Sequence, residues 1–288
     1  MSRLERWTPW VFVLIWSSGF VVAKYAFKYS DVLFFLGIRR LIAGGILLLI
    51  TLAFGQSLRL TKNQIVISLA LGLTLQGLYL GGVWEAIASG SPAGIASVVT
   101  STQPILVSLM AFFILKERLQ RNQVIGLFLG FAGVILVLSP ALSSAGEMTI
   151  FAFSLLLLGL TGSTTATLIQ KKFGDTLPLL AGTTYQFLFA GVVLTLISII
   201  TGRTDLQWNL QSSLAMAWAV IVTSIIAVIA LLWMLQRGSA AKVSSLLYLV
   251  PSVTALQAYL IFAEKLNAQA IIGIAMTALG VALVQRTQ

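Results

Sequence analysis

Long apolar runs separated by short polar segments fill this chain from one end to the other. The runs lack the strict alternation of apolar and polar residues that a half-buried strand shows. Each is close to the roughly 20 residues that a helix needs to cross about 30 Å of hydrocarbon. The pattern predicts ten membrane-spanning helices, at residues 8–27, 32–54, 65–87, 93–115, 121–139, 149–170, 178–201, 213–236, 240–262 and 268–285. Backbone groups in lipid need internal hydrogen-bond partners, so we expect an all-α integral membrane protein.

An internal repeat organises these runs. The segment 93–137 returns at 240–284 without a gap, at a constant offset of 147 residues. Matching residues include Pro104 and Pro251, Glu117 and Glu264, Gly126 and Gly273, and Gly133 and Gly280. We therefore expect two repeats of five helices each, at 1–141 and 148–288. Because five is odd, the second repeat would enter the membrane upside down, which makes an inverted repeat.

Composition points to lipid as the environment. Of the 288 residues, 58% are hydrophobic and 9% are charged, against roughly 25% charged in a soluble domain. The net charge of +10 comes from basic residues between the apolar runs, which favours membrane topology over a nucleic-acid partner. The chain has no cysteine and no histidine, so we expect no disulfide, no thiol or histidine catalysis, no metal site and no cofactor.

The basic residues also predict an orientation. With the N-terminus in the cytoplasm, twelve Lys and Arg residues fall on the inner side and six on the outer side. Positive residues concentrate on the cytoplasmic side of membrane proteins. We therefore expect both termini to be cytoplasmic.

Two proline-interrupted helices indicate a site near the middle of the membrane. A proline inside a helix removes a backbone hydrogen bond and frees a carbonyl group about one turn earlier. Discontinuous helices at matching places in two repeats are typical of transporter binding sites. We expect Pro104 and Pro251 to act as hinges or cavity walls, with nearby polar side chains facing a ligand, namely Ser97, Thr100, Ser101, Ser244 and Tyr248.

Further polar and aromatic residues lie inside apolar runs, where they should not face lipid. They either line the same cavity or allow helices to pack closely. These candidates are Trp16, Ser17, Gln76, Tyr79, Ser163, Thr164 and Trp233.

Glu85 is the acidic residue that lies clearly within an apolar run, near the outer end of the third predicted helix. An ionisable group inside a membrane needs a partner, and it often has a functional role. We name Lys24 or Arg39 as the expected partner, because both fall at the same level. Glu85 would then form a structural charge pair, or else bind a substrate ammonium group or carry a coupling proton.

Glycines recur every seven residues on the fifth and tenth predicted helices, at Gly126, Gly133, Gly273 and Gly280. Small residues at this spacing let two helix backbones approach closely. We expect them to pack helices within one chain or at the seam of a homodimer.

Three features carry a family resemblance: IWSSGFVVAKYAF in the first helix, FFLGIRRLIAGGILLL in the second, and the repeated proline–glutamate–leucine–glycine pattern. Together they resemble the EamA type of the drug/metabolite transporter superfamily. The resemblance covers essentially the whole chain. It implies an inner-membrane carrier, commonly an exporter of amino acids or other metabolites, with its cavity between the two repeats. One asymmetry is that Gln186 stands in the second repeat where the first has Arg39.

The function most consistent with these features is secondary transport by alternating access. An enzyme would need a nucleophile and base, a metal cluster or paired acids. A channel would be expected to show a filter or a ring of like charge. The sequence shows none of these features. We expect a cavity of hydroxyls, amides and aromatic rings with little fixed charge, which suits amino acids exported from the cytoplasm. A multidrug or lipophilic-cation exporter of the same fold is the alternative.

Overall fold

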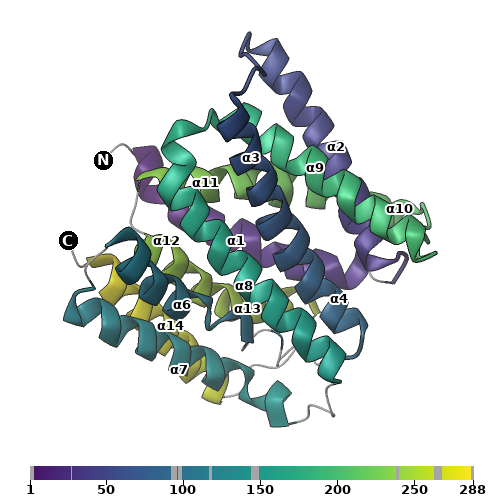
Figure 1. Ribbon diagram of the computed structural model, residues 1–288. Coiled ribbons are helices and arrows are strands. Elements are labelled where there is room, and N and C mark those ends of the chain that lie inside the picture. The colour runs from purple at the N-terminus through teal and green to yellow at the C-terminus, as the bar shows by residue number, and fades with distance from the viewer. Residues whose placement is uncertain are drawn as a thin grey trace.

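The computed structural model describes residues 3–26, 28–91, 96, 99–116, 119–143, 149–237, 240–262 and 268–286. This part of the chain is helical and contains no strand, apart from a single antiparallel bridge between Ser30 and Leu206. The expected all-α class is confirmed, and Figure 1 shows the helices gathered into one bundle. The helical segments are, in order, α1 (Arg3–Ala26), α2 (Val32–Ala53), α3 (Lys62–Leu71), η1 (Gly72–Gly81), α4 (Gly82–Ala88), α6 (Gln103–Met110), η2 (Ala111–Leu115), α7 (Arg121–Ser143), α8 (Ile150–Phe173), η3 (Gly174–Thr176), α9 (Leu179–Ile200), α10 (Leu210–Trp218), η4 (Ala219–Ile226), α11 (Ala227–Arg237), α12 (Ala240–Ser245), η5 (Leu246–Tyr248), α13 (Leu249–Phe262) and α14 (Ala268–Arg286).

Within the described residues, six helices are long and apolar enough to cross a membrane. They span Val32–Ala53, Lys62–Ala88, Arg121–Ser139, Ile150–Thr176, Leu179–Ile200 and Leu210–Arg237. Two further apolar helices, Gln103–Leu115 and Ala268–Val284, are shorter. A multi-pass membrane fold is thus supported, and the total of ten crossings stays a prediction.

The offset of 147 residues reappears in the bounds of the helices. Adding 147 to the bounds of α1, Arg3–Ala26, gives those of α8, Ile150–Phe173. The same addition converts α2, Val32–Ala53, into α9, Leu179–Ile200. It also carries the start of η1 at Gly72 onto the start of η4 at Ala219. The helix order is consistent with two five-helix repeats.

Two pairs of repeat-related helices pack against each other, α2 with α9 and α7 with α14. Figure 1 shows α7 and α14 side by side along one edge of the bundle. Glycines make this approach close. A Cβ atom on Gly280 would lie 2.5 Å from the backbone nitrogen of Gly130, and one on Gly133 would lie 2.6 Å from that of Thr277. The glycines expected to pack helices therefore do so within this chain.

Two loops that correspond under the offset of 147 residues, 54–61 and 201–208, lie at opposite ends of the bundle. At the start of α2, the amide of Asp31 donates to the carbonyl of Asp205, at 2.8 Å. The loop after α9 is therefore at this end, and α2 carries the chain away from it to residues 54–61. There, Gln64 donates to the carbonyl of Thr176 at 2.6 Å. Segments 54–61 and 201–208 correspond under the offset of 147, so this arrangement agrees with an inverted repeat.

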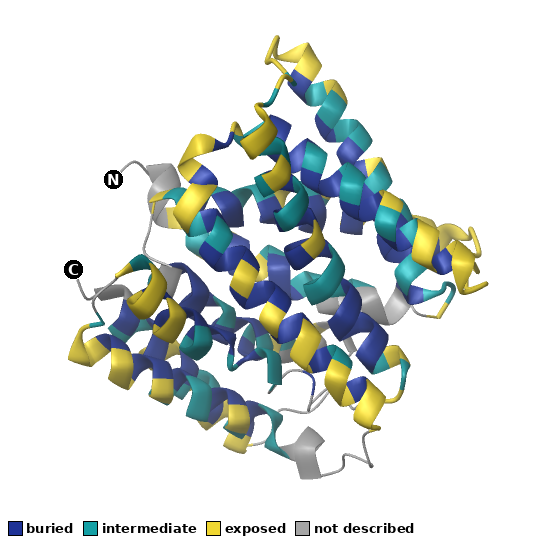
Figure 2. Ribbon diagram, viewed as in Figure 1, coloured by how far each residue is buried: buried dark blue, intermediate teal, exposed yellow. Residues whose placement is uncertain are grey.

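Burial follows the expected division between core and lipid-facing surface. Figure 2 shows dark blue, buried positions facing the interior and yellow, exposed positions on the outer faces of the helices. Large apolar side chains such as Leu49, Phe113 and Phe128 are among the exposed ones. In a membrane these faces would contact lipid, because an aqueous surface would penalise so much exposed apolar area.

Candidate functional site

Two cavities that the described residues line share two side chains. The first, which we call the arginine cavity, occupies about 480 Å³ including its open side. Its walls come from α1, α2, η1, α4 and η4. The residues that give it its chemistry are Trp16, Arg39, Arg40, Tyr79, Trp84 and Thr223.

The second, which we call the hydroxyl cavity, is narrower and is walled by α1, η1, α6, α8, α11 and α12 together with η5. Apolar side chains make up about half of its lining. Its polar and aromatic lining residues are Trp16, Tyr79, Gln103, Ser163, Thr167 and Ser244. Trp16 and Tyr79 therefore lie where the two cavities meet.

The two cavities extend toward opposite ends of the bundle. The arginine cavity reaches Trp84, whose neighbour Glu85 pairs with Arg203 at the end that holds Asp31. The hydroxyl cavity reaches Leu235, and the adjacent Gln236 donates to the carbonyl of Gly174 at the other end. Trp16 and Tyr79, which line both cavities, thus lie between a space that extends toward one end and a space that extends toward the other.

Wide helical turns shape the walls of the arginine cavity. Both η1 and η4 are π-helical, a conformation that is rare, occurs mostly inside α-helices and is frequent at functional sites. η1 supplies Tyr79 and Leu80, and η4 supplies Thr223. Because η1 and η4 are related by the offset of 147 residues, both repeats place a π-helical segment in or beside the cavity.

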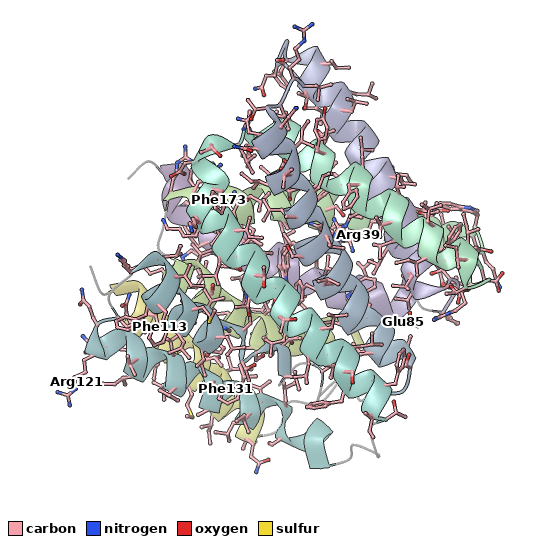
Figure 3. All side chains as sticks on the ribbon, in the orientation of Figure 1. Arg39, Glu85, Phe113, Arg121, Phe131 and Phe173 are labelled. Atoms are coloured by element: carbon pink, nitrogen blue, oxygen red, sulfur yellow. The ribbon has the colours of Figure 1, made fainter. Side chains whose placement is uncertain are left out.

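Arg39 is fixed by neutral acceptors on η4. Its Nη2 donates to Thr223 Oγ1 at 2.7 Å, and its Nε donates to Ser224 Oγ at 2.7 Å and to the carbonyl of Ala219 at 3.1 Å. The guanidinium also lies 5.8 Å from the centroid of the Trp84 ring, within reach of a cation–π interaction. Figure 3 shows Arg39 in the interior of the bundle. These contacts link α2 of the first repeat to the π-helix of the second.

Arg40, the next residue on α2, has a different environment. Its side chain is fully buried, and its Nε, Nη1 and Nη2 atoms have no hydrogen-bond partner in the described part of the chain. Its guanidinium lies 4.8 Å from the centroid of the Phe187 ring on α9. The offset of 147 residues pairs Arg40 with Phe187 itself, so the second repeat carries an aromatic ring where the first carries the charge.

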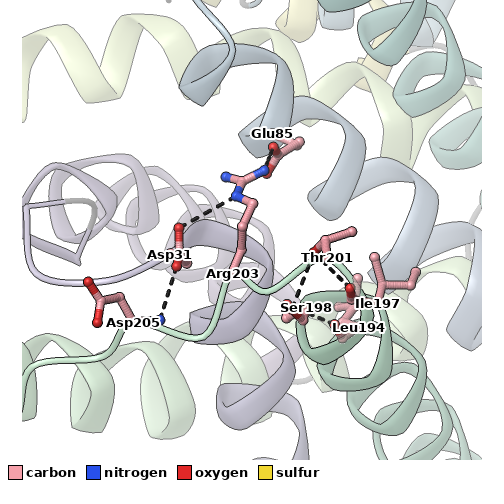
Figure 4. Close-up of polar contacts among 8 residues, drawn as sticks. All are labelled: Asp31, Glu85, Leu194, Ile197, Ser198, Thr201, Arg203 and Asp205. Carbon is pink, nitrogen blue, oxygen red and sulfur yellow. Dashed lines mark hydrogen bonds and ion pairs between the residues drawn. The ribbon is translucent and has the colours of Figure 1, made fainter.

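A polar cluster joins the loops at one end of the bundle. Arg203, which follows α9, pairs with Glu85 of α4 and lies 3.5 Å from Oδ1 of Asp31 (Figure 4). The hydrogen bond to Glu85, helped by the charges of Glu85 and Asp31, raises the pKa of Arg203 above its ordinary value. The backbone amide of Asp205 donates to Oδ2 of Asp31 at 3.0 Å.

This cluster corrects the expected partner of Glu85. Arg203 takes the place expected of Arg39, whose side chain is held by hydroxyl groups of η4. The side chain of Lys24 lies outside the described part of the chain. Glu85 therefore forms a charge pair close to the end of the continuous span Lys62–Ala88 (Figure 4), and Figure 3 shows its place in the bundle. A role in coupling stays a prediction.

The two cavities contain some of the expected binding residues. Trp16 and Tyr79 line both, Ser163 and Ser244 line the hydroxyl cavity, and Arg39 lines the arginine cavity. The other described candidates are held in helix packing or lie outside both linings. These are Ser17, Gln76, Thr100, Ser101, Thr164, Trp233 and Tyr248. Ser97 lies outside the described residues.

Contacts explain several of these positions. The Oγ1 atom of Thr164 donates to the carbonyl of Leu160 in its own helix, at 2.8 Å. The Oγ atom of Ser17 faces the carbonyl of Val250 at the start of α13, at 3.4 Å. Tyr248 is fully buried, and its ring fits against Gly130 of α7. The guanidinium of Arg237 lies 4.5 Å from the centroid of the Trp233 ring.

Both expected hinge prolines lie at breaks between helical segments. Pro104 is in the first turn of α6, directly after a turn at Ser101 and Thr102. Pro251 is the third residue of α13, after a short 3-10 segment that separates it from α12. Proline is tolerated in a first helical turn, where its missing N–H is not needed. The prolines thus mark discontinuities in both spans, and their role as moving hinges stays a prediction.

The structure also identifies lining residues that sequence reasoning did not select as site residues: Arg40, Trp84, Gln103, Thr167 and Thr223. Gln103 donates from Nε2 to Thr167 Oγ1 at 3.2 Å, which connects α6 to α8. Two guanidinium groups line one cavity, so the expectation of little fixed charge is wrong. The Arg-Arg pair inside an apolar run was a usable signal, because intramembrane charges usually face the interior.

Comparisons with known proteins agree with this architecture. The model of the EamA-like transporter family matches residues 10–139 and again residues 150–286. The uncharacterized transporter YvbV of Bacillus subtilis is 29% identical over 94% of this chain and 88% of its own length. The uncharacterized inner membrane transporter YedA of Escherichia coli is 31% identical over 84% of this chain and 78% of its own.

Two further similarities concern part of the chain and the fold. A probable amino-acid metabolite efflux pump of Salmonella typhimurium is 29% identical over 145 residues, which are 50% of this chain and 46% of that protein. A crystal structure with 19% sequence identity superposes with a TM-score of 0.83 over 97% of both chains. At this identity the superposition shows a shared fold.

An all-helical bundle with long apolar spans and interior cavities that point to opposite ends is the architecture of a membrane transporter. The chain belongs to the EamA-like transporter family. Membership implies a small-molecule substrate and a surrounding lipid bilayer.

Proposed function

We propose that this chain is a secondary transporter that exports small metabolites, with amino acids as its first substrate class. Transport would proceed by alternating access, with two inverted repeats, 1–141 and 148–288, moving against each other around the two cavities. The names of the family and of its relatives indicate transport rather than catalysis.

The observation that carries this proposal is the meeting of two cavities at Trp16 and Tyr79. Alternating access requires a central site that is open to one side of the membrane at a time. A narrow point between cavities that face opposite ends is the geometry expected of such a site. The breaks before Pro104 and Pro251 lie in repeat-related spans, where bending would change the width of the hydroxyl cavity that α6 and α12 help to wall.

Amino acids fit the chemistry of the lining. Hydroxyl and amide groups from Ser163, Thr167, Gln103 and Ser244 offer hydrogen bonds, and aromatic rings offer apolar contact. The Salmonella relative is named as a probable amino-acid metabolite efflux pump, which supports the same substrate class. The alternative of a lipophilic-cation exporter is disfavoured, because Arg39 and Arg40 would repel a cation in the arginine cavity.

We assign the protein to the inner (plasma) membrane, with both termini in the cytoplasm. The Escherichia coli relative is named as an inner membrane transporter, which supports the location. The distribution of basic residues supports the orientation. In this orientation Arg203, Glu85 and Asp31 lie at the outer end, and the hydroxyl cavity faces the cytoplasm.

Counterflow in proteoliposomes tests the proposal. Purified full-length protein is reconstituted, the vesicles are loaded with an unlabelled amino acid, and entry of the same labelled amino acid is followed over time. We expect labelled phenylalanine or leucine to accumulate transiently above the level in protein-free vesicles. Absence of exchange for every amino acid, in vesicles that do exchange lipophilic cations, would overturn the substrate class and favour the multidrug alternative.

A further inference from the structure

Among the residues that the structure describes, Arg40 is a buried cation without a polar partner. Its exposed fraction is zero, and none of its three guanidinium nitrogens has a hydrogen-bond acceptor among the described residues. Arg39, one residue earlier, shows what a satisfied guanidinium looks like in this bundle, with three acceptors on η4. The ring of Phe187 provides Arg40 with an aromatic face and no acceptor. Arg40 therefore keeps its full hydrogen-bonding capacity for something else.

Leaving such a group unpaired is costly. A guanidinium keeps its charge in proteins and presents donors in a planar fork. Burying a charge without a counter-charge carries a large desolvation penalty, and buried charges are normally paired. An ionisable group inside a membrane protein is by default a functional candidate whose partner should be named. For Arg40, the space available for a partner is the arginine cavity that it lines.

The cavity itself supplies no carboxylate to balance the charge. The described lining contains two guanidinium groups and neither Asp nor Glu. Glu85 follows the lining residue Trp84, but it is outside the lining and its Oε1 atom pairs with Arg203. The arginine cavity is therefore electropositive, and an anion entering it would neutralise a charge that the protein leaves uncompensated.

We propose that Arg40 binds the carboxylate of the transported solute, and that the cavity selects aromatic monocarboxylates whether or not they carry an amino group. This inference rests on the proposed transport function and narrows its substrate class. A carboxylate matches the guanidinium fork through two parallel, charge-assisted hydrogen bonds. The rings of Trp16, Tyr79 and Trp84 then enclose the aromatic part of the solute.

Solutes that lack either the amino group or the carboxylate distinguish this proposal from amino-acid export alone. With no acidic side chain in its described lining, the arginine cavity offers no ion pair to an ammonium group. Removing the amino group from phenylalanine, which gives 3-phenylpropanoate, should therefore preserve binding. Removing the carboxylate, which gives phenethylamine, should abolish it.

Ligand binding to the purified full-length protein in detergent tests this directly. The dissociation constants of 3-phenylpropanoate, its uncharged methyl ester, phenylalanine and phenethylamine are measured by isothermal titration calorimetry. We expect 3-phenylpropanoate to bind at least as tightly as phenylalanine, and about tenfold or more tightly than the methyl ester or the amine. Because these solutes are compared on the unaltered protein, the result does not require any variant to fold correctly.

Variants then assign the effect to Arg40. In Arg40→Gln we expect 3-phenylpropanoate to bind about tenfold or more weakly, while the affinity for the methyl ester stays unchanged. Arg40→Lys keeps the charge without the fork and should recover part of the affinity. Arg59→Gln removes an exposed arginine that does not line either cavity, and it should bind all four solutes like the parent protein.

Two results would overturn the inference. Equal affinity of the parent protein for 3-phenylpropanoate, its ester and phenethylamine would show that the cavity does not read the carboxylate. Equal weakening of every solute in Arg40→Gln would give Arg40 a purely structural role against Phe187. Exchange of phenylalanine in proteoliposomes together with either result would leave the proposed transport function intact, whereas absence of all exchange would overturn that function separately.

Discussion

Three arginines in this bundle illustrate how local partners decide what a charge does. Arg39 is held by hydroxyl groups and a carbonyl of η4 and connects the two repeats. Arg40 has a ring as its neighbour and no acceptor within the described chain. Arg203 is part of an ion-paired cluster with Glu85 and Asp31 at the end of the bundle. Among these three, only Arg203 has an acidic partner within the described chain. We call its cluster with Glu85 and Asp31 the latch, because it lies at the end of the bundle toward which the arginine cavity extends.

Removing the latch charge should open this end of the cavity. The chain has no cysteine, so a single Gly19→Cys reporter in the arginine cavity can be labelled without background; a Cβ there makes only ordinary contacts, at 3.7 Å. We expect Arg203→Gln to increase the labelling rate by a water-soluble thiosulfonate severalfold, because Glu85 and Asp31 lose their shared partner. Arg59→Gln, at the opposite end, is the matched control. An unchanged rate in Arg203→Gln would show that the latch does not limit access to the arginine cavity.

The stability that Arg203 contributes through the latch should not change in mildly alkaline solution. A group whose pKa is raised by folding contributes stability that is lost only as the pH rises through that pKa. Arg203 already titrates far above neutrality, and Glu85 raises its pKa further. The difference in melting temperature between the parent protein and Arg203→Gln should therefore be constant from about pH 7 to about pH 9. A difference that shrinks over this range would contradict the assigned charge state.

Some residues that line the cavities could be anticipated from the sequence, because bulky or polar side chains in the middle of a span rarely face lipid. Trp16 and Tyr79 lie mid-span, and both line the cavities, as expected. Tyr248 and Ser17 lie outside both described linings, because they pack against Gly130 and near Val250 on other helices. In a membrane, the lipid-facing and the packed faces of a helix are both apolar, so periodicity does not say which neighbour a residue meets. The wide turns of η1 and η4 shift the faces further.

At the scale of helices, close backbone contact between α7 and α14 organises one edge of the bundle. Gly126, Gly133, Gly273 and Gly280 all have neighbouring backbone atoms within 2.7 Å of where a Cβ would lie. No side chain could move aside to relieve such a contact. This contact between repeat-related helices could be anticipated from the seven-residue spacing, although the spacing alone left a homodimer seam as an alternative.

A pair of glycine substitutions tests this packing. Gly280→Ala would place a methyl group 2.5 Å from the backbone nitrogen of Gly130, so we expect the free energy of unfolding to fall by about 1–3 kcal/mol or more. Gly45→Ala, on α2, meets nothing within 4 Å and should be neutral or stabilising by up to about 1 kcal/mol, because alanine favours helix. Thermal unfolding in detergent, followed by intrinsic fluorescence, measures both. Equal effects of the two substitutions would contradict the close approach.

Other elements show what the sequence could and could not predict. The offset of 147 residues anticipated the bounds of α8 and α9 from those of α1 and α2. It did not anticipate that α6 begins only at Gln103, or that η5 interrupts the ninth span. Hydropathy averages over a window, and a break of a few residues inside an apolar run leaves that average unchanged. The two prolines indicated where the breaks lie, but the geometry of each break could be seen only in the structure.

At the scale of the whole molecule, the opposite placement of two corresponding loops connects the fold to the proposed mechanism. The loop at 54–61 and its counterpart at 201–208 lie at opposite ends of the bundle, since Asp205 joins Asp31 at the start of α2. Two halves of opposite orientation can exchange conformations, and that exchange would turn a cavity facing one side into a cavity facing the other. The arginine and hydroxyl cavities are the two spaces that this exchange would open in turn.

The sidedness of one pair of matched positions tests this claim most directly. Ser57 and Thr204 are exposed, differ by 147 residues and lie in the corresponding loops. Single cysteines at the two positions are probed in intact cells with a membrane-impermeant maleimide, before and after permeabilisation. An inverted repeat with cytoplasmic termini predicts that Thr204→Cys is labelled from outside and that Ser57→Cys is labelled only after permeabilisation. Labelling of both cysteines from the same side would contradict the inverted repeat and the mechanism built on it.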